Sequence, residues 1–479
     1  MRFTPPMIVV GDHQCMDCRM DDGYVEFSSS EENCRTGGVL EDPRLSRMYL
    51  ALARQRFAEW RHRAWRAAAM RSGALTMIVL ALLLLGLAFA WREHTKGHFA
   101  LLKAELKQPT PSRAAAAPQP GGQDAIVLER TPIGGGTMPE FLSTTVLPGR
   151  GMNVLQITAF VPSKGEVKLL ASPPLAEAAS LMTGTGADTN GAVSLAMGAA
   201  IEAPWAGRIF GAPANGGLNA TWNGQNVSLP VERRNGSPVA MGGLLLRSAA
   251  TSVKTNVMPD GGEAEAVYDV GDFDDHWPSQ MKVATSVQLS SRALEMKVVA
   301  TNTGNEVQPV GIGWQPRFAV EKADRGALML RLPSVTRSEV RDRHSGIPSG
   351  RLLPATGTKY DFSSRTGAAL GTLNLDDTFV HLRQAPLDNG PVAELRDPAN
   401  DYGLRITLLS TAIKAVHVEA PADGNFVTIA PRFNYDDPLG REWPRDEDTG
   451  MVVLGPGRSA TWRIRLEIFA LTSNHSDRL

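Results

Sequence analysis

A group of side chains that could bind a metal ion lies near the N-terminus. His13, Cys15 and Cys18 have the spacing H-x-C-x2-C, and Cys34 is the next cysteine along the chain. Imidazole nitrogens and thiolates hold zinc in tetrahedral sites. The pattern differs from a typical zinc motif, because a lone Cys34 takes the place of a second C-x2-C pair. A zinc site is therefore one interpretation of this segment, and a reduced tail without packed structure is the other.

Carboxylates and histidines of the C-terminal half could carry out acid–base chemistry. A carboxylate can take a proton as a general base, and an imidazole can donate one near neutral pH. Each residue type is also common on surfaces and in turns, so sequence position alone assigns no role. The candidates are Asp436, Asp437, Glu442, His276, His344, His381 and His417.

The stretch from Ala74 to Trp91, ALTMIVLALLLLGLAFAW, contains no charged residue. A helix rises about 1.5 Å per residue, so this run would cover roughly 27 Å, enough for a thin bilayer. Arginines are more frequent before the run than after it, which places the N-terminal side in the cytoplasm. The sequence thus predicts a single-pass signal anchor at residues 74–91, with the C-terminal part periplasmic or extracellular. The alternatives are cleavage after Ala90, because Ala88-Phe89-Ala90 has the small-x-small form of a signal peptidase site, and a buried core helix.

The segments around this run have separate expected roles. Residues 1–47 show little apolar periodicity and are interpreted as a disordered cytoplasmic tail, or as absent if translation starts at Met48. Residues 48–73 have arginines between apolar residues at helical spacing, which predicts a basic amphipathic helix at the inner membrane surface. Residues 92–124 begin as a helix and end in a Pro/Ala-rich linker.

The composition limits the partners of the chain. Its 479 residues include 49 Lys plus Arg and 50 Asp plus Glu, so no nucleic acid or other polyanion is expected as a partner. All three cysteines precede residue 74, so the part that follows must be stabilised by its core and not by disulfides. No cofactor is expected, and the oligomeric state stays open.

Residues 125–473 have the pattern of a β protein. Short runs that alternate apolar and polar residues are separated by turn signals such as Asn223-Gly224, Asn235-Gly236 and Asp260-Gly261. Many such strands in one stretch predict a mainly β fold, a large antiparallel β-sandwich. The expected strands include 154–160, 166–170, 282–289, 294–301, 328–332, 379–382, 404–409, 415–418 and 460–469.

Four stretches of this region resemble, in order, the motifs of the aldose 1-epimerase (galactose mutarotase-like) family. They are Pro204-Trp205-Ala206-Gly207-Arg208-Ile209 with Trp222-Asn223-Gly224 and Val227-Ser228-Leu229-Pro230; Gly313-Trp314-Gln315-Pro316-Arg317-Phe318; Tyr360-Asp361-Phe362 with Leu375-Asp376-Asp377-Thr378-Phe379; and Val427-Thr428-Ile429-Ala430-Pro431 with Leu454-Gly455-Pro456-Gly457. The resemblance implies a galactose mutarotase-like sandwich, an isomerase ancestry and a sugar cleft on one face.

The family's proton-transfer residues have no counterpart at the matching positions. The resemblance implies a Glu as base where Ala430 stands and a His as acid where Gln315 stands, and it implies a further His, which binds sugar hydroxyls, where Met241 stands. The family's sugar-binding Arg and Asp are matched by Arg208 and Asp376. The expected substrate-binding residues are therefore Arg208, Gln315, Asp376 and Trp314, and Trp205 and Trp277 could also stack on a sugar or pack in the core.

Three functions are compatible with this pattern. The first is a membrane-anchored, exported protein that binds a sugar or glycan without epimerase activity. The second is an active aldose 1-epimerase, or a related sugar enzyme, whose base and acid come from the candidates above. The third is a structural or assembly protein of the cell envelope that reuses the fold.

Overall fold

The computed structural model describes residues 17–21, 24–28, 80–87, 117–132, 137–214, 216–234 and 237–471. The chain divides into two compact units, residues 1–113 and residues 114–479. The first unit contains β1 (Asp17–Asp21), paired antiparallel with β2 (Tyr24–Ser28), and a helical segment at residues 80–87.

Most of the predictions for the N-terminal part lie outside the described residues. His13, Cys15, Cys34, residues 48–73 and residues 92–116 are in this category. Within the described ranges, no helix is both long enough and apolar enough to cross a membrane. The described ranges also contain no group of three or more His, Cys, Asp or Glu side chains that could hold a metal ion.

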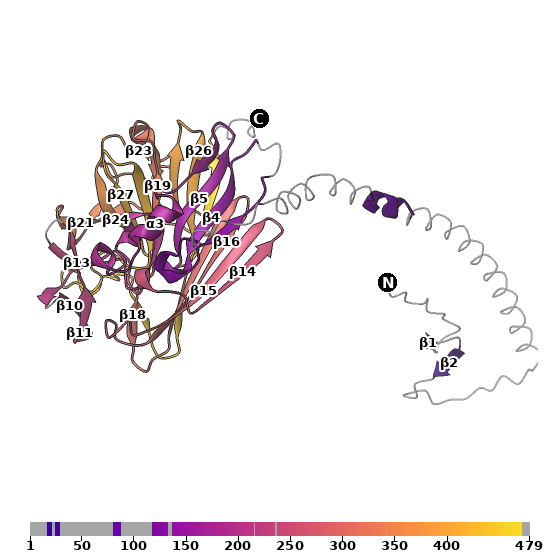
Figure 1. Ribbon diagram of the computed structural model, residues 1–479, viewed down its shortest axis with the longest axis horizontal. Helices are drawn as coiled ribbons and strands as arrows, with labels where there is room; N and C mark the ends of the chain where they lie inside the picture. The colour runs from indigo at the N-terminus through magenta and orange to yellow at the C-terminus, as the bar shows by residue number, and fades with distance from the viewer. Residues whose placement is uncertain are drawn as a thin grey trace, which may run out of the picture. The chain divides into compact units, whose positions relative to one another are not determined.

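The second unit is mainly β and contains two large antiparallel sheets (Figure 1). The nine-stranded sheet has one edge formed by the long hairpins of β14 to β17. Its strands are, in spatial order, β14 (Ser252–Met258), β15 (Gly261–Gly271), β16 (Met281–Leu289), β17 (Ala293–Asn302), β30 (Ser459–Ala470), β26 (Tyr402–Leu408), β25 (Val392–Asp397), β20 (Met329–Arg331) and β23 (Ala368–Ala369).

The eleven-stranded sheet contains the strands that carry the site. Its strands are, in spatial order, β22 (Ile347–Pro354), β21 (Thr336–Asp342), β24 (Leu375–Val380), β27 (Ala415–Ala420), β28 (Phe426–Arg432), β19 (Gly313–Ala319), β7 (Ala199–Glu202), β5 (Asn153–Val161), β4 (Glu140–Leu147) and β3 (Ile126–Glu129), with β6 (Gly165–Lys168) paired to β5. Three smaller groups accompany the sheets: β9 (Ala212–Ala214), β10 (Gly217–Trp222) and β11 (Gln225–Pro230); β8 (Arg208–Ile209), β12 (Glu232–Arg234) and β13 (Ser237–Met241); β18 (Gln308–Val310) and β29 (Val452–Leu454). The short helices are α3 (Leu175–Leu181) and α4 (Val193–Ala196).

Burial differs between the two sheets. Strands β15, β16, β17 and β30 alternate buried and more exposed residues, as expected when one face packs on a core and the other faces water. Strands β7 and β28 are buried at every position, and β19 and β27 at nearly every position. The centre of the eleven-stranded sheet is therefore covered on both faces, by the hydrophobic core on one and by connecting segments on the other.

The predicted β-sandwich is confirmed, and most expected strands lie within a residue or two of the observed ones. The largest difference concerns the strand expected at 379–382, because β24 instead covers Leu375–Val380. Strand β24 ends where His381 adopts a left-handed backbone conformation with φ of 52°, which a continuing strand cannot accommodate. The Asn223-Gly224 turn signal is confirmed, because both residues have positive φ between the paired strands β10 and β11.

Candidate functional site

Five neighbouring strands place polar side chains on the covered outer face of the eleven-stranded sheet. Thr378 of β24 lies opposite His417 of β27, and His417 lies opposite Ala430 of β28. On the other side of β28, Arg432 lies opposite Gly313 of β19. Directly opposed residues of an antiparallel pair share a face, so residues far apart in sequence meet in one row.

Arg208 and Asp376, the two sugar-binding positions that the resemblance identified, contact each other. Arg208 Nη2 donates to Asp376 Oδ1 at 2.5 Å. Arg208 is 3% exposed, whereas the Asp376 side chain is 23% exposed. Burial by itself would lower the pKa of Arg208, but Asp376, Asp436 and Glu419 outweigh it and raise the pKa. The guanidinium is therefore a permanent cation, and Asp376 is the more accessible end of the pair.

His417 is the one candidate histidine that lies in this group. It is buried, and its Nε2 lies 3.3 Å from Asp376 Oδ1. Its Nδ1 lies 3.0 Å from Thr378 Oγ1 and 3.6 Å from Asp436 Oδ2. The imidazole thus sits between two carboxylates, so either nitrogen can be protonated next to an acceptor.

Asp436 connects the loop after β28 to this group of charges. Its carboxylate accepts hydrogen bonds from Thr378 Oγ1 at 2.8 Å and from the Arg208 backbone N–H at 3.2 Å. Arg432 Nη1 donates to it at 3.2 Å. Burial raises the pKa of Asp436, but Arg208, Arg432 and His417 outweigh burial and lower it to about 2. The group is ionised at every pH at which the protein is expected to work.

Arg432 joins this side of the group to Gln315 and Glu202. Its Nη2 donates to Gln315 Oε1 at 3.1 Å, and its Nε lies 3.5 Å from Glu202 Oε2. Glu202 is 1% exposed and accepts a hydrogen bond from the Gly207 N–H, while its Oε2 has no hydrogen-bond partner among the described residues. Burial raises the pKa of Glu202 despite the nearby Arg432.

We call Glu202, Arg208, Asp376, His417, Arg432 and Asp436 the charge cluster. Sequence analysis did not identify Glu202 or Arg432 as members. A charged residue at the end of an otherwise apolar strand, as in Ala199–Glu202 and Phe426–Arg432, is the signal that could have indicated them, because such residues are rarely buried without partners.

The residues at the positions of the family's Glu and two His residues lie in or beside the cluster. The methyl group of Ala430 is fully buried opposite His417. Gln315 is 7% exposed and is engaged by Arg432, and Met241 pairs with Arg208 across β13 and β8. None of these three side chains can transfer a proton.

Two glycines let backbone segments approach the cluster. A Cβ at Gly346, which has φ of 81°, would lie 2.4 Å from Arg208 Nη1. A Cβ at Gly207, with φ of 74°, would lie 2.4 Å from Arg432 Nη1 and 2.5 Å from Asp436 Oδ1. The turn after β21 and the segment before β8 therefore cover the arginines closely, and only glycine permits this.

Asp437 and Glu442 form a separate pair of carboxylates. Asp437 Oδ1 accepts a hydrogen bond from the Phe210 N–H at 2.9 Å. Burial and the neighbouring Glu442 raise the pKa of Asp437 well above its usual value. Adjacent aspartates of one loop thus have pKa values displaced in opposite directions, because Asp436 faces arginines and Asp437 faces another carboxylate.

The other candidates lie away from the cluster. His276 Nδ1 lies 2.7 Å from the Ser228 carbonyl oxygen, His381 Nε2 lies 3.5 Å from Glu447, and His344 follows β21 in an exposed turn. The expectation that Trp314 stacks on a sugar is not supported by its position, because the indole is fully buried and packs edge-on against Phe318. Trp205 and Trp277 stack on each other in the core, with ring centroids 5.4 Å apart.

Comparison with known proteins identifies relatives of this fold. The family model described as Aldose 1-epimerase matches residues 190–467. A galactose mutarotase-like protein from Clostridium acetobutylicum is 16% identical, with a TM-score of 0.56 over 73% of this chain and 99% of that protein. The GalM/aldose epimerase homologue from C. elegans is 16% identical, with a TM-score of 0.53 over 68% of this chain and 95% of that protein. No protein with a curated description matches the chain in sequence.

Proposed function

This chain belongs to the aldose 1-epimerase family, and from this premise we propose that its β domain, residues 125–473, binds a sugar or glycan without catalysing anomerisation. Anomerisation requires a base for the anomeric hydroxyl and an acid for the ring oxygen. A site that has lost both the base and the acid can still bind a sugar.

The observation that carries the proposal is the side chain at position 430. Ala430 places a methyl group opposite His417, where the family resemblance implies a carboxylate. Gln315, at the position of the acid, can form hydrogen bonds but cannot titrate near neutral pH. General acid and base steps contribute about 10²- to 10⁴-fold each, so loss of both should bring the rate close to that in buffer.

Binding requires only hydrogen bonds and packing, and groups for both remain. Asp376 can accept a hydrogen bond from a sugar hydroxyl through its exposed edge, and Gln315 can donate or accept one. Arg208 holds Asp376 in place for this contact. A ligand at this face would therefore meet a positioned carboxylate before it meets the buried charges behind it.

Polarimetry on a freshly dissolved single anomer of glucose or galactose tests the catalytic half of the proposal. We expect no dependence of the rate on the concentration of residues 114–479, the compact unit that contains the β domain. Gain of activity in the double variant Ala430→Glu with Gln315→His would show that only the proton-transfer groups are missing. A clear rate with the unmodified protein would contradict the proposal.

Calorimetric titration with hexoses and short glycans tests the binding half. We expect binding that weakens in the Asp376→Asn variant, while Asp423→Asn, which alters an exposed turn residue, serves as the charge-matched control. No detectable binding of any sugar would leave a structural role in the cell envelope as the better interpretation.

An active enzyme is the second candidate, and the position of His417 favours it. Its Nε2 lies 3.3 Å from Asp376 Oδ1, next to the site of the missing carboxylate. If the unmodified protein accelerates mutarotation, His417→Asn should abolish that acceleration while Asp437→Asn should leave it unchanged.

We also propose that residues 74–91 anchor the protein in the cell membrane, with the N-terminus in the cytoplasm and the β domain outside. The described part of this run, residues 80–87, is helical and exposes large apolar side chains, with Leu85 66% exposed. Such side chains suit contact with lipid. A phosphatase fusion at the C-terminus should be active only if that end is exported, and a cytoplasmic C-terminus would contradict the proposal.

A further inference from the structure

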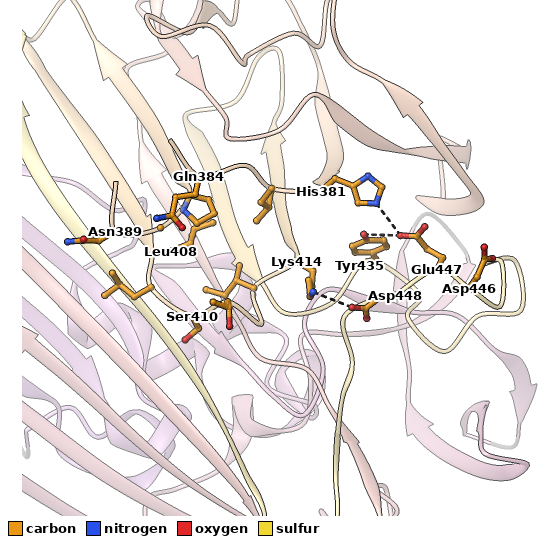
Figure 2. A pocket seen from close by; sticks show the side chains of 16 residues that line it. His381, Gln384, Asn389, Leu408, Ser410, Lys414, Tyr435, Asp446, Glu447 and Asp448 are labelled. Atoms are coloured by element: carbon orange, nitrogen blue, oxygen red, sulfur yellow. Dashed lines mark hydrogen bonds and ion pairs between the residues drawn. The ribbon is translucent and has the colours of Figure 1, made fainter. Parts of the chain in front are cut away.

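A cavity of about 530 Å³ lies in the same compact unit, and Figure 2 shows the side chains that line it. Its wall is built from the connection between β24 and β25, the turn between β26 and β27, and the loop after β28. A cavity of this volume is within the range of small-molecule sites. No residue of the charge cluster lines it.

The cavity and the charge cluster are separated along the same strands. Val380 and Ala415 follow Thr378 and His417 toward the cavity, and both are fully buried against Tyr435 and Trp443. The rings of Tyr435 and Trp443 pack edge-on with centroids 5.4 Å apart. Tyr435 lines the cavity and the next residue, Asp436, belongs to the charge cluster, so the two sites are neighbours that share no lining residue.

Part of the cavity lining is apolar. Leu408 at the end of β26 is 2% exposed, and Ile413 in the following turn is 5% exposed. Leu382 and Pro391 add further apolar surface. Such a surface suits the carbon face of a ring.

Neutral hydrogen-bonding groups lie at one end, on the left in Figure 2. Gln384, Asn389 and Ser410 are labelled there, and Thr411, which follows Ser410 in the sequence, also lines the cavity. Ser410 Oγ donates to the Thr461 carbonyl, which leaves its lone pairs for a ligand. The side chains of Asn389 and Thr411 make no hydrogen bond with any residue that the structure describes. Hydroxyl groups of a ligand could pair with all four.

Carboxylates lie at the other end, on the right in Figure 2. Glu447 accepts a hydrogen bond from the Tyr435 hydroxyl at 3.0 Å, and Lys414 Nζ lies 3.3 Å from Asp448 Oδ2. Asp446 forms no ion pair with any described residue. Three carboxylates and one ammonium group give this end a net negative charge. This end is complementary to a cation.

We propose that this cavity is a second binding site and that its ligand is an amino sugar, with its hydroxyl groups toward Asn389 and Thr411 and its protonated amine toward Asp446 and Glu447. The apolar part of the lining contacts the ring face, the neutral end satisfies hydroxyls, and the acidic end neutralises the ammonium. The inference does not depend on sugar binding at the charge cluster, because the two sites share no lining residue.

Titration of the compact unit, residues 114–479, with a β-1,4-linked glucosamine tetramer tests this proposal. Three comparison ligands separate the contributions: the N-acetylated tetramer and cellotetraose lack the amine, and spermidine lacks the sugar. We expect the glucosamine tetramer to bind most tightly of the four ligands. Its affinity should fall as the salt concentration rises, because salt screens an exposed charge contact. Backbone amide shifts should change in residues 381–391 and 409–414 and not in β19.

Two variants locate the contacts. Asp446→Asn should lower the affinity for the glucosamine tetramer about fivefold, as expected for the loss of one exposed ion pair, and should leave the affinity for cellotetraose unchanged. The control Asp423→Asn makes the same charge change in an exposed turn between β27 and β28 and should have no effect. Asn389→Ala should lower the affinity for both the glucosamine tetramer and cellotetraose.

Other results would overturn the proposal. Equal affinity for spermidine and the glucosamine tetramer would make the cavity a general cation site. Equal affinity for cellotetraose, with no effect of Asp446→Asn, would remove the role of the amine. Absence of binding by all four ligands, or shift changes confined to the charge cluster, would show that the cavity binds no amino sugar.

Discussion

The charge cluster lies largely on strands of the eleven-stranded sheet, whereas the cavity is lined mainly by the segments that connect strands, and the polar groups of the two sites are paired to different degrees. In the cluster, buried charges are paired within the protein, as Arg208 is with Asp376 and Arg432 is with Asp436. In the cavity, Asp446 has no partner among the described residues, and neutral side chains face open space. A ligand at the cluster must compete with pairs that already exist, whereas a ligand in the cavity also meets Asp446, Asn389 and Thr411, which have no such partner among the described residues. The cluster should therefore matter most for stability and the cavity most for binding.

The largest expected effect on stability comes from breaking the cluster at Arg208. Arg208→Gln removes the cation that Asp376 and Asp436 share, and an unpaired buried charge costs about 3 to 5 kcal/mol. Urea unfolding of residues 114–479 measures this loss. Arg292→Gln is the matched control, because Arg292 is exposed, and it should change the free energy of unfolding by about 0.5 kcal/mol or less. Equal effects of the two variants would mean that the cluster is not a stabilising unit.

Acid should weaken the cluster through Asp436. Its pKa is about 2 in the folded state against 3.8 for an ordinary aspartate. The stabilisation is fully present above about pH 5, where the side chain is ionised in both the folded and the unfolded state, and it is lost as pH falls through the folded pKa. The loss is about 2 kcal/mol. Unfolding measured from pH 5 to pH 2 should therefore show a shallower decline in Asp436→Asn than in the unmodified protein, and Asp423→Asn should follow the unmodified protein.

The neighbouring Asp437 should respond in the opposite direction. Its raised pKa means that ionising Asp437 in the folded protein is unfavourable. The contribution of Asp437 to stability is therefore fully present below pH 3.8, and it is lost as pH rises through the pKa that Asp437 has in the folded state. Asp437→Asn removes the repulsion from Glu442 and keeps an oxygen for the Phe210 N–H. We expect a gain of about 1 kcal/mol at pH 8 and little change at pH 4. A loss of stability at pH 8 would contradict the assignment of this pair.

The smallest expected effect on stability comes from the cavity. Asp446→Asn and Asn389→Ala remove side chains that are exposed and form no hydrogen bond with the described residues. Each should change the free energy of unfolding of residues 114–479 by about 0.5 kcal/mol or less, as a typical surface substitution does. Thermal melts of the variants measure this change. A large destabilisation by either would place the cavity, like the cluster, among the structural parts of the molecule.

Much of the fold followed from the sequence because the relevant signals are local. Alternation with period two indicated strands such as β16 and β17, and the Asn223-Gly224 pair indicated a hairpin turn. The strand expected at 379–382 ends at Val380 in the structure. The left-handed conformation of His381 ends it, and nothing in the local sequence pattern indicates that conformation. The predicted anchor and zinc ligands stay predictions, since most of their residues are not described.

The sequence by itself determined the β class, the family motifs and the residue types at positions 208, 315, 376 and 430. The tertiary structure decided their relations. Arg208 and Asp376 are 168 residues apart in sequence and form one ion pair, and Trp314 points to the core while Gln315 points to the cluster. It also decided that the pKa of Asp436 is lowered by neighbouring arginines and that the pKa of Asp437 is raised by burial and Glu442. Side-chain alternation depends on near neighbours, whereas pairing and burial depend on which distant strands lie side by side, and this is set only when the sheets assemble.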